Sequence, residues 1–274
     1  MIEKNLEIEG CNGRKISIDY RCKEVSEPLI PIIYVHGFKG FKDWASSNAV
    51  ADAFAEKGFF YLKFNFSHNG VTAEDPIDFV DLEAFGNNNY SIEFQELGLV
   101  IDWLEKSDLN IQFSKLAIIG HSRGGGITLL RTAQDIRIQK AITWASVSDF
   151  EKHFPVDVSE WKEKGVQHIL NGRTMQVMPL YYQLYQTFQE HRNELDIPKH
   201  CANIQQDVLI VHGTNDPVVS LEEAEQIHSL VKNSTLLKIN DAGHTFGAVH
   251  PAKDLLSEHL IEVIDVCIDF LNNN

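Results

Sequence analysis

Residues 115–126 read Lys-Leu-Ala-Ile-Ile-Gly-His-Ser-Arg-Gly-Gly-Gly, and this segment predicts the central turn of the fold. The apolar run that ends at Ile119 predicts a buried strand, and residues 124–134 predict a helix. A Gly-x-Ser-x-Gly pattern between a strand and a helix predicts a tight, strained turn, because side chains at the two glycine positions would collide with neighbouring elements. Such a turn holds the Ser122 hydroxyl out at the top of a sheet, beside the positive end of the following helix.

Strands and helices alternate on both sides of this turn. We expect an antiparallel hairpin over residues 6–21, followed by strands at 30–35, 59–64, 115–119, 141–145, 208–211 and 235–239. Helices are expected at 44–57, 91–106, 124–134, 221–231 and 253–271. The alternation predicts an α/β fold with a mostly parallel sheet, an antiparallel N-terminal hairpin and helices on both faces.

The alternation stops after Asp149 and resumes near Gln206. The interval is rich in aromatic residues but has no obvious strand of a parallel sheet. We therefore predict one core domain, formed by residues 1–148 and 207–274, with residues 149–206 inserted as a cap subdomain. Within the cap, Tyr181, Tyr182 and Tyr185 have helical spacing, which is typical either of a helix that packs on the core or of a pocket roof.

The composition indicates an ordinary soluble globular protein rather than a nucleic-acid or membrane protein. The chain of 274 residues is 43% hydrophobic and 23% charged, and its formal net charge is −15. Acidic residues are spread along the chain, whereas nucleic acid or an anionic membrane requires a basic patch, so we expect neither as a partner. The N-terminus lacks the basic start and apolar core of a signal peptide, so we expect a cytoplasmic protein. The sequence does not indicate the oligomeric state.

The cysteines and histidines give no metal pattern. Cys11 and Cys22 flank the expected hairpin and could form a bridge, but we expect all four cysteines to be reduced thiols. The twelve histidines include no His-Glu-x-x-His motif, so we expect no metal and no other cofactor.

Two further residues can complete a nucleophilic site with Ser122. A serine hydroxyl needs a base within hydrogen-bond reach, and the base must be oriented by a third group. Asp216 follows the expected strand at 208–211, and His244 follows the one at 235–239. Because ligands bind at the carboxyl ends of strands in open α/β sheets, we expect these side chains to converge with Ser122. The alternatives are Asp149 for the acid, and His212 or His250 for the base.

Three motifs together resemble a known superfamily: Gly-His-Ser-Arg-Gly-Gly at 120–125, His-Gly-Thr-Asn-Asp-Pro-Val-Val at 212–219 and Ala-Gly-His-Thr-Phe at 242–246. Over nearly the whole chain outside the cap, the sequence resembles the α/β-hydrolase superfamily, in particular its dienelactone-hydrolase, prolyl-oligopeptidase-like and cinnamoyl-esterase-like branch. The resemblance implies that Ser122 is the nucleophile, Asp216 the orienting acid and His244 the general base. His36-Gly37-Phe38 matches the oxyanion loop, which implies that the backbone N–H groups of Phe38 and Arg123 stabilise the oxyanion.

The resemblance also implies a serine carboxylesterase that forms an acyl-enzyme. A pocket under the cap would suit small to medium, partly hydrophobic or aromatic esters, and its candidate lining residues are Met178, Tyr181, Tyr182 and Tyr185. No β-propeller precedes the hydrolase unit in this sequence, so we expect esters rather than peptides. The alternatives are an acyl-peptide or amide hydrolase, a thioesterase or acyltransferase, and a non-catalytic ligand-binding protein. The Arg123 side chain is expected either to bind a substrate carboxylate or to pair with a nearby acid.

Overall fold

A single twisted sheet organises the computed structural model, which describes residues 1–252 and 256–273. Its eight strands follow the order β1-β2-β4-β3-β5-β6-β9-β10. β1 pairs antiparallel with β2, and β2 with β4, whereas the remaining pairs are parallel. The bounds are β1 Ile2–Glu9, β2 Lys15–Arg21, β3 Ile30–Val35, β4 Phe59–Asn65, β5 Ala117–His121, β6 Lys140–Trp144, β9 Asp207–Gly213 and β10 Ser234–Ile239.

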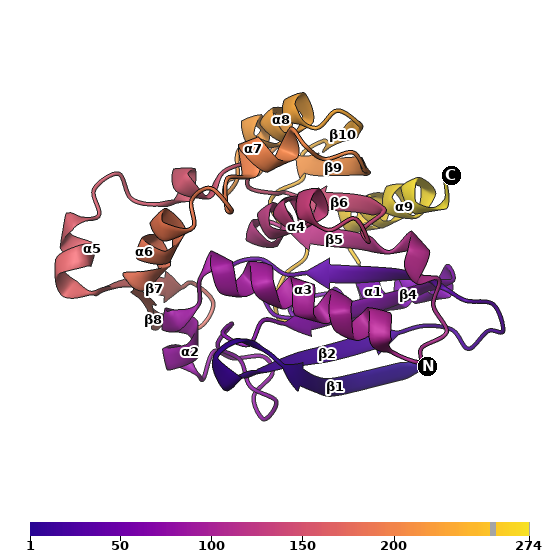
Figure 1. Ribbon diagram of the computed structural model, residues 1–274, viewed down its shortest axis with the longest axis horizontal. Coiled ribbons are helices and arrows are strands. Elements are labelled where there is room, and N and C mark those ends of the chain that lie inside the picture. The colour runs from indigo at the N-terminus through magenta and orange to yellow at the C-terminus, as the bar shows by residue number, and fades with distance from the viewer. Residues whose placement is uncertain (253–255, 274) are drawn as a thin grey trace.

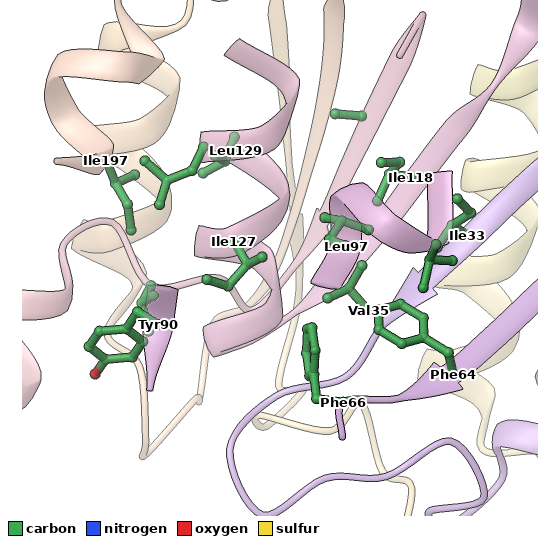
Figure 2. Close-up of a cluster of buried hydrophobic side chains, with 14 of the residues drawn as sticks. Ile33, Val35, Phe64, Phe66, Tyr90, Leu97, Ile118, Ile127, Leu129 and Ile197 are labelled. Atoms are coloured by element: carbon green, nitrogen blue, oxygen red, sulfur yellow. The ribbon is translucent and has the colours of Figure 1, made fainter. Parts of the chain in front are cut away.

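Helices cover both faces of this sheet (Figure 1). One face carries α3 (Tyr90–Lys106), α4 (Arg123–Gln134) and α8 (Leu221–Leu230), whose apolar side chains share a core with β3 and β5. Figure 2 shows part of this core, in which Leu97 of α3 and Ile127 of α4 lie near Val35 and Ile118 of the sheet. The other face carries α1 (Ser47–Glu56) and α9 (Glu258–Asn272).

Every strand and helix expected in the core is present, with small shifts at the ends. α1 begins at Ser47 rather than Trp44, because residues 41–47 form two successive turns in which Trp44 N donates to Phe41 O and Ser47 N to Trp44 O. α9 begins at Glu258, where Ser257 caps it by accepting the Leu260 N–H. The expected start of this helix at 253–255 lies outside the described residues.

The segment between β6 and β9 forms its own small unit beside the sheet. β7 (Val166–Asn171) and β8 (Gln176–Tyr181) make an antiparallel hairpin, accompanied by α5 (Ser159–Lys164), α6 (Gln183–Glu190) and α7 (Ile197–Cys201). β7, β8, α5 and α6 lie at the end of the molecule opposite the two chain termini (Figure 1). The division into a core domain and an inserted cap stays a prediction.

One local expectation for this segment is corrected. Tyr181 is the last residue of β8 and not part of a helix, and α6 starts only at Gln183. The ladder with β7 explains this, because Val166 pairs with Tyr181 and keeps that residue extended. α2 (Leu82–Asn87), which follows β4, packs against β8.

Two further properties of the described chain concern its thiols and its helices. The four cysteines are free, so Cys11 and Cys22 form no bridge. None of the helices in residues 1–252 and 256–273 combines the length and the apolar character needed to cross a bilayer.

Candidate active site

Ser122 occupies a strained turn between β5 and α4. Its φ is 56° and its ψ −122°, a conformation that costs a non-glycine residue of order 1–3 kcal/mol. The flanking glycines allow this turn. A Cβ at Gly120 would lie 2.3 Å from Thr128 Oγ1 of α4, and one at Gly124 would lie 2.4 Å from the Val35 carbonyl oxygen of β3. The Gly-x-Ser-x-Gly spacing is therefore required by close approach of the strand and helix on either side.

Asp216 and His244 meet although 28 positions separate them in the sequence. His244 Nδ1 donates to Asp216 Oδ2 at 2.8 Å. Each side chain follows a parallel strand, β9 or β10, and the two strands pair in register from residue 208 to residue 213. Their loops therefore leave the sheet at the same edge as Ser122 at the end of β5, and Ser122 and His244 line the same cavities.

The Asp216 carboxylate is fully enclosed and stays ionised. Burial raises its pKa, but the hydrogen bond from His244 and those from the backbone N–H groups of Val219 and Val218 outweigh burial, so the pKa lies below its ordinary value. An ionised, buried carboxylate fixes the His244 tautomer that carries its proton on Nδ1, which leaves Nε2 able to accept a proton.

The alternative acid and bases have other partners. Asp149 caps the short 3-10 helix at Phe150–His153, where it accepts the Glu151 N–H at 2.9 Å. His212 is fully buried; its Nε2 donates to the Val219 carbonyl at 2.9 Å and lies 3.4 Å from Asp216 Oδ2. His250 accepts the Ala45 N–H on Nδ1 at 2.9 Å. The structure thus gives His244 the short contact with Asp216, at 2.8 Å, whereas the three alternatives form hydrogen bonds with backbone groups.

His121, directly before the nucleophile, supports the loop of His244. Its Nε2 donates to the His244 carbonyl oxygen at 2.9 Å. Burial, reinforced by the neighbouring His244 ring, lowers the pKa of His121 to about 3, so the ring is neutral near pH 7. A neutral ring that donates from Nε2 positions the loop without exchanging protons with Ser122.

The loop after β3 lies directly against the nucleophile. A Cβ at Gly37 would stand 2.9 Å from Ser122 Cβ and 3.4 Å from Ser122 Oγ, so only glycine permits this approach. His36 braces the loop, because its Nδ1 donates to the Gly37 carbonyl at 3.0 Å. Burial lowers the pKa of His36 to about 4 although this hydrogen bond opposes the shift.

The predicted oxyanion donors flank the serine. Phe38 follows Gly37 in this loop and lines the same cavities as Ser122. Arg123 is the first residue of α4, and an N–H group in the first helical turn has no acceptor within its own helix. Both residues therefore lie close to Ser122, and the role of their N–H groups as oxyanion donors stays a prediction.

The Arg123 side chain pairs with an acid rather than pointing freely into solvent. Its Nη2 donates to Glu93 Oε1 of α3 at 2.5 Å, and its guanidinium lies 4.6 Å from the centroid of the Phe38 ring. Asn88 Nδ2 donates to the same Glu93 oxygen at 2.8 Å. Burial raises the pKa of Glu93 even though Arg123 and Asn88 oppose that shift. The second of the two expectations for this side chain, pairing with a nearby acid, matches the structure.

Two cavities meet at the serine. One, of about 400 Å³, extends beneath the inserted segment, and the other, of about 280 Å³, extends toward the loop of residues 39–47. Both are lined by Phe38, Lys39, Ser122 and His244. The larger cavity is mostly apolar, and its aromatic lining consists of Phe38, Tyr90, Phe150, Phe154 and Trp161. We call these two spaces the aromatic chamber and the loop chamber.

None of the four pocket residues expected from the sequence is among the described residues that line the aromatic chamber. Met178 is completely buried in the core. Tyr181 projects onto α2, where its hydroxyl donates to Glu83 Oε2 at 2.6 Å. The rings of Tyr182 and Tyr185 pack on Trp161 and Phe154, with centroids 5.8 and 5.1 Å apart respectively. Tyr182 and Tyr185 therefore contact residues of the chamber wall, whereas Tyr181, the last residue of β8, contacts α2.

Sequence reasoning missed the actual wall residues and Lys39. Phe150, Phe154 and Trp161 belong to the same aromatic-rich interval but lack a periodic pattern, so only the fold could assign them to the chamber. Lys39 follows the oxyanion loop directly in sequence, which is the signal that could have found it. Among residues 1–252 and 256–273, no group of three or more His, Cys, Asp or Glu side chains is arranged to hold a metal ion.

Comparison with known proteins agrees with this geometry. The family described as the prolyl oligopeptidase family matches residues 46–260. The uncharacterized hydrolase YugF of Bacillus subtilis (strain 168) is 24% identical over 245 residues, which cover 76% of this chain and 87% of that protein.

Solved structures show the fold. Est1E from Butyrivibrio proteoclasticus, with ferulic acid bound, superposes with a TM-score of 0.76 at 19% identity, over 97% of both chains. A putative hydrolase from Agrobacterium vitis S4 gives a TM-score of 0.74 at 18% identity over the full length of both chains. The α/β-hydrolase fold expected from the sequence is confirmed.

Proposed function

We propose, from the premise that this chain belongs to the prolyl oligopeptidase family, that it is a serine hydrolase of carboxylic esters. The observation that carries the proposal is the Asp216–His244 hydrogen bond at the rim of the cavities that contain the strained Ser122. A strained serine next to a base with a fixed tautomer is typical of nucleophilic catalysis.

In the proposed reaction, Ser122 Oγ attacks the ester carbonyl carbon while His244 Nε2 takes the hydroxyl proton. The carbonyl oxygen becomes an oxyanion that accepts hydrogen bonds from the backbone N–H groups of Phe38 and Arg123. The C–O bond to the alcohol then breaks, and His244 returns its proton to the leaving oxygen. Water repeats the two steps on the acyl-Ser122 ester and releases the acid.

The aromatic chamber supports a partly hydrophobic or aromatic ester as the substrate. Its volume of about 400 Å³ fits a small to medium group and not a folded peptide chain. Tyr90 stacks face to face on Phe150 with ring centroids 3.9 Å apart, which gives a flat, rigid wall for a planar group. Est1E, a structural neighbour, is known with ferulic acid bound, and ferulic acid is an aromatic carboxylic acid.

Amide hydrolysis is the second candidate, because the matched family is described by a peptidase name. The same triad can attack amides, but the amine can leave only after His244 has transferred its proton to the nitrogen. Comparing an ester and a 4-nitroanilide of the same acid separates the two candidates. We expect the ester to have the higher kcat/KM by more than its intrinsic reactivity explains.

Ser122→Ala tests the proposed chemistry directly. We expect kcat for 4-nitrophenyl butyrate to fall by at least about a thousandfold, and labelling by a fluorophosphonate probe to disappear. Ser229→Ala, on the exposed side of α8, is the matched control and should keep both signals. Unchanged hydrolysis in Ser122→Ala would refute the proposal.

A further inference from the structure

The walls around Ser122 carry cations and no acids, in a chain of the opposite overall charge. The chain has 39 Asp and Glu residues against 24 Lys and Arg residues. Within the described residues, the linings of the aromatic and loop chambers nevertheless include Lys39, Arg123 and Arg173 but no carboxylate. The nearest acid of the catalytic machinery, Asp216, is enclosed behind His244 and backbone N–H groups. The described walls of the two chambers therefore present positive side chains and no negative one.

Two of the three cations already have a carboxylate partner. Arg123 pairs with Glu93, and Arg173 pairs with Asp78 and also donates to the Ile77 carbonyl at 3.0 Å. Lys39 differs, because its ammonium makes no ion pair or hydrogen bond with any residue that the structure describes. Its Nζ makes a cation–π contact with the Phe38 ring, 5.8 Å from the ring centroid. Such a contact at a half-exposed site contributes only about 0.5–1 kcal/mol.

The backbone of Lys39 adopts a conformation that is costly for a lysine. Gly40 N donates to Gly37 O at 3.0 Å, which closes a turn with Lys39 at its third position. The φ of Lys39 is +54°, which glycine or asparagine adopts at lower cost than lysine. A lysine at such a position, with its side chain lining both chambers, is an outlier that points to a role for the charge.

We infer that Lys39 binds a carboxylate carried by the substrate, so that the preferred ester is a monoanion; this deepens the proposed esterase function and rests on it. A single lysine provides one compact positive charge, which matches one carboxylate, whereas a phosphate dianion calls for additional donors. Because Lys39 lines both chambers, the carboxylate can lie on the acyl group or on the alcohol, and the experiment distinguishes these two sources.

The test compares esters that differ by one carboxylate. For the acyl side, the pair is 4-nitrophenyl hexanoate and the mono-4-nitrophenyl ester of adipic acid. For the alcohol side, the pair is 4-(butyryloxy)benzamide and 4-(butyryloxy)benzoate. The readout is the ratio of kcat/KM for the anionic ester to kcat/KM for its neutral partner. In one pair at least, Lys39→Met and Lys39→Gly should lower this ratio about tenfold, since a charged hydrogen bond is worth about 1.5 kcal/mol or more.

Two variants act as controls for this ratio. Lys39→Arg keeps the charge and should keep most of the ratio, while Lys39→Gly relieves the positive φ and so separates charge from backbone strain. Lys232→Met removes the same charge from an exposed turn after α8 and should leave the ratio unchanged. A ratio in Lys39→Met equal to that of the wild-type protein in both pairs would overturn the inference.

Binding separates this inference from the esterase proposal. If none of the four esters is hydrolysed, the proposed function fails, and calorimetric affinities of the same esters for Ser122→Ala decide the role of Lys39. We then expect at least one of the two anionic esters to bind about tenfold more weakly when Lys39→Met is added. Equal affinities with and without Lys39→Met would reject the anion site even on a catalytically inactive protein.

Discussion

Asp216 acts only as an acceptor, and all its partners are donors. Its Oδ1 accepts the N–H groups of Val218 and Val219, and its Oδ2 accepts His244 Nδ1–H. If an NH₂ group replaced either oxygen, it would face another hydrogen-bond donor, and that contact would be lost.

Asp216→Asn should therefore lower kcat for 4-nitrophenyl butyrate by about 10³–10⁴-fold, because the amide stabilises the wrong tautomer of His244. The free energy of unfolding should also drop by about 1–3 kcal/mol, since a buried donor loses its partner. Steady-state kinetics and urea titration measure the two effects. Asp149→Asn, which changes the alternative acid but preserves a good helix cap, should leave kcat at the wild-type value.

Some residues of the candidate site could be predicted from the sequence, and others could not. The convergence of Asp216 and His244 near Ser122 was predictable because each of the three lies in a motif directly after a strand. The partner of Arg123 was not, because Glu93 is on another helix and only packing of α3 against α4 brings the two together. The pocket residues failed for a related reason. The direction of Tyr181 depends on its pairing with Val166, which residue spacing alone does not reveal.

At the scale of elements, the loop of residues 36–47 is held from beneath by a buried charge network. Lys42 Nζ lies 2.9 Å from Asp19 Oδ2, and Lys63 Nζ lies 2.6 Å from Asp43 Oδ1. Lys63 also donates to the Lys42 carbonyl at 2.9 Å. The two lysines and two aspartates balance in charge, which makes their burial tolerable. The network fixes the loop that carries Phe38 and Lys39 to β2 and β4.

Gly37→Ala tests how closely this loop must approach the nucleophile. The added methyl would stand 2.9 Å from Ser122 Cβ and 3.0 Å from the His121 carbonyl oxygen, so loop and serine must separate. We expect kcat to fall at least about tenfold as the Phe38 N–H moves away from the oxyanion, and stability to fall by about 1–3 kcal/mol. Gly172→Ala is the control, because a Cβ there has no neighbour within 4 Å. A kcat in Gly37→Ala equal to that of the control would contradict this role of the loop.

In the segment between β6 and β9, the strands β7 and β8 were not predicted from the sequence. Asn171-Gly172 between two short apolar runs is a hairpin signal, and it corresponds to the turn between β7 and β8. The signal was weak because polar residues, Gln167 and His168, interrupt the first run and Pro179 interrupts the second. In the core, by contrast, continuous apolar runs such as Ile30–Val35 gave the strands with nearly correct ends.

For the whole molecule, buried neutral histidines link stability to pH. Burial lowers the pKa of His36 from 6.5 to about 4. The unfolded chain therefore binds a proton at His36 below about pH 6.5, while the folded protein does not until about pH 4. Between these values the unfolded state binds more protons, so stability decreases as the pH falls.

His36→Asn should reduce this dependence. Asparagine does not titrate, and its amide can replace the donor to the Gly37 carbonyl. In urea titrations from about pH 6.5 to about pH 4, the loss of unfolding free energy per pH unit should be smaller in the variant by about 1 kcal/mol. His168→Asn, at an exposed position of β7, should retain the wild-type slope. An unchanged slope in His36→Asn would show that another group causes the acid sensitivity.

The arrangement of two chambers on either side of one serine affects what happens after the first half of the proposed reaction. When the alcohol departs, its chamber empties while the acyl group still fills the other. The next molecule to attack must come through that vacated space, whose walls are shaped for an alcohol. An added alcohol that fits those walls then competes with water for the acyl group. The ratio of transferred to hydrolysed product therefore reports how well each alcohol fits the vacated chamber.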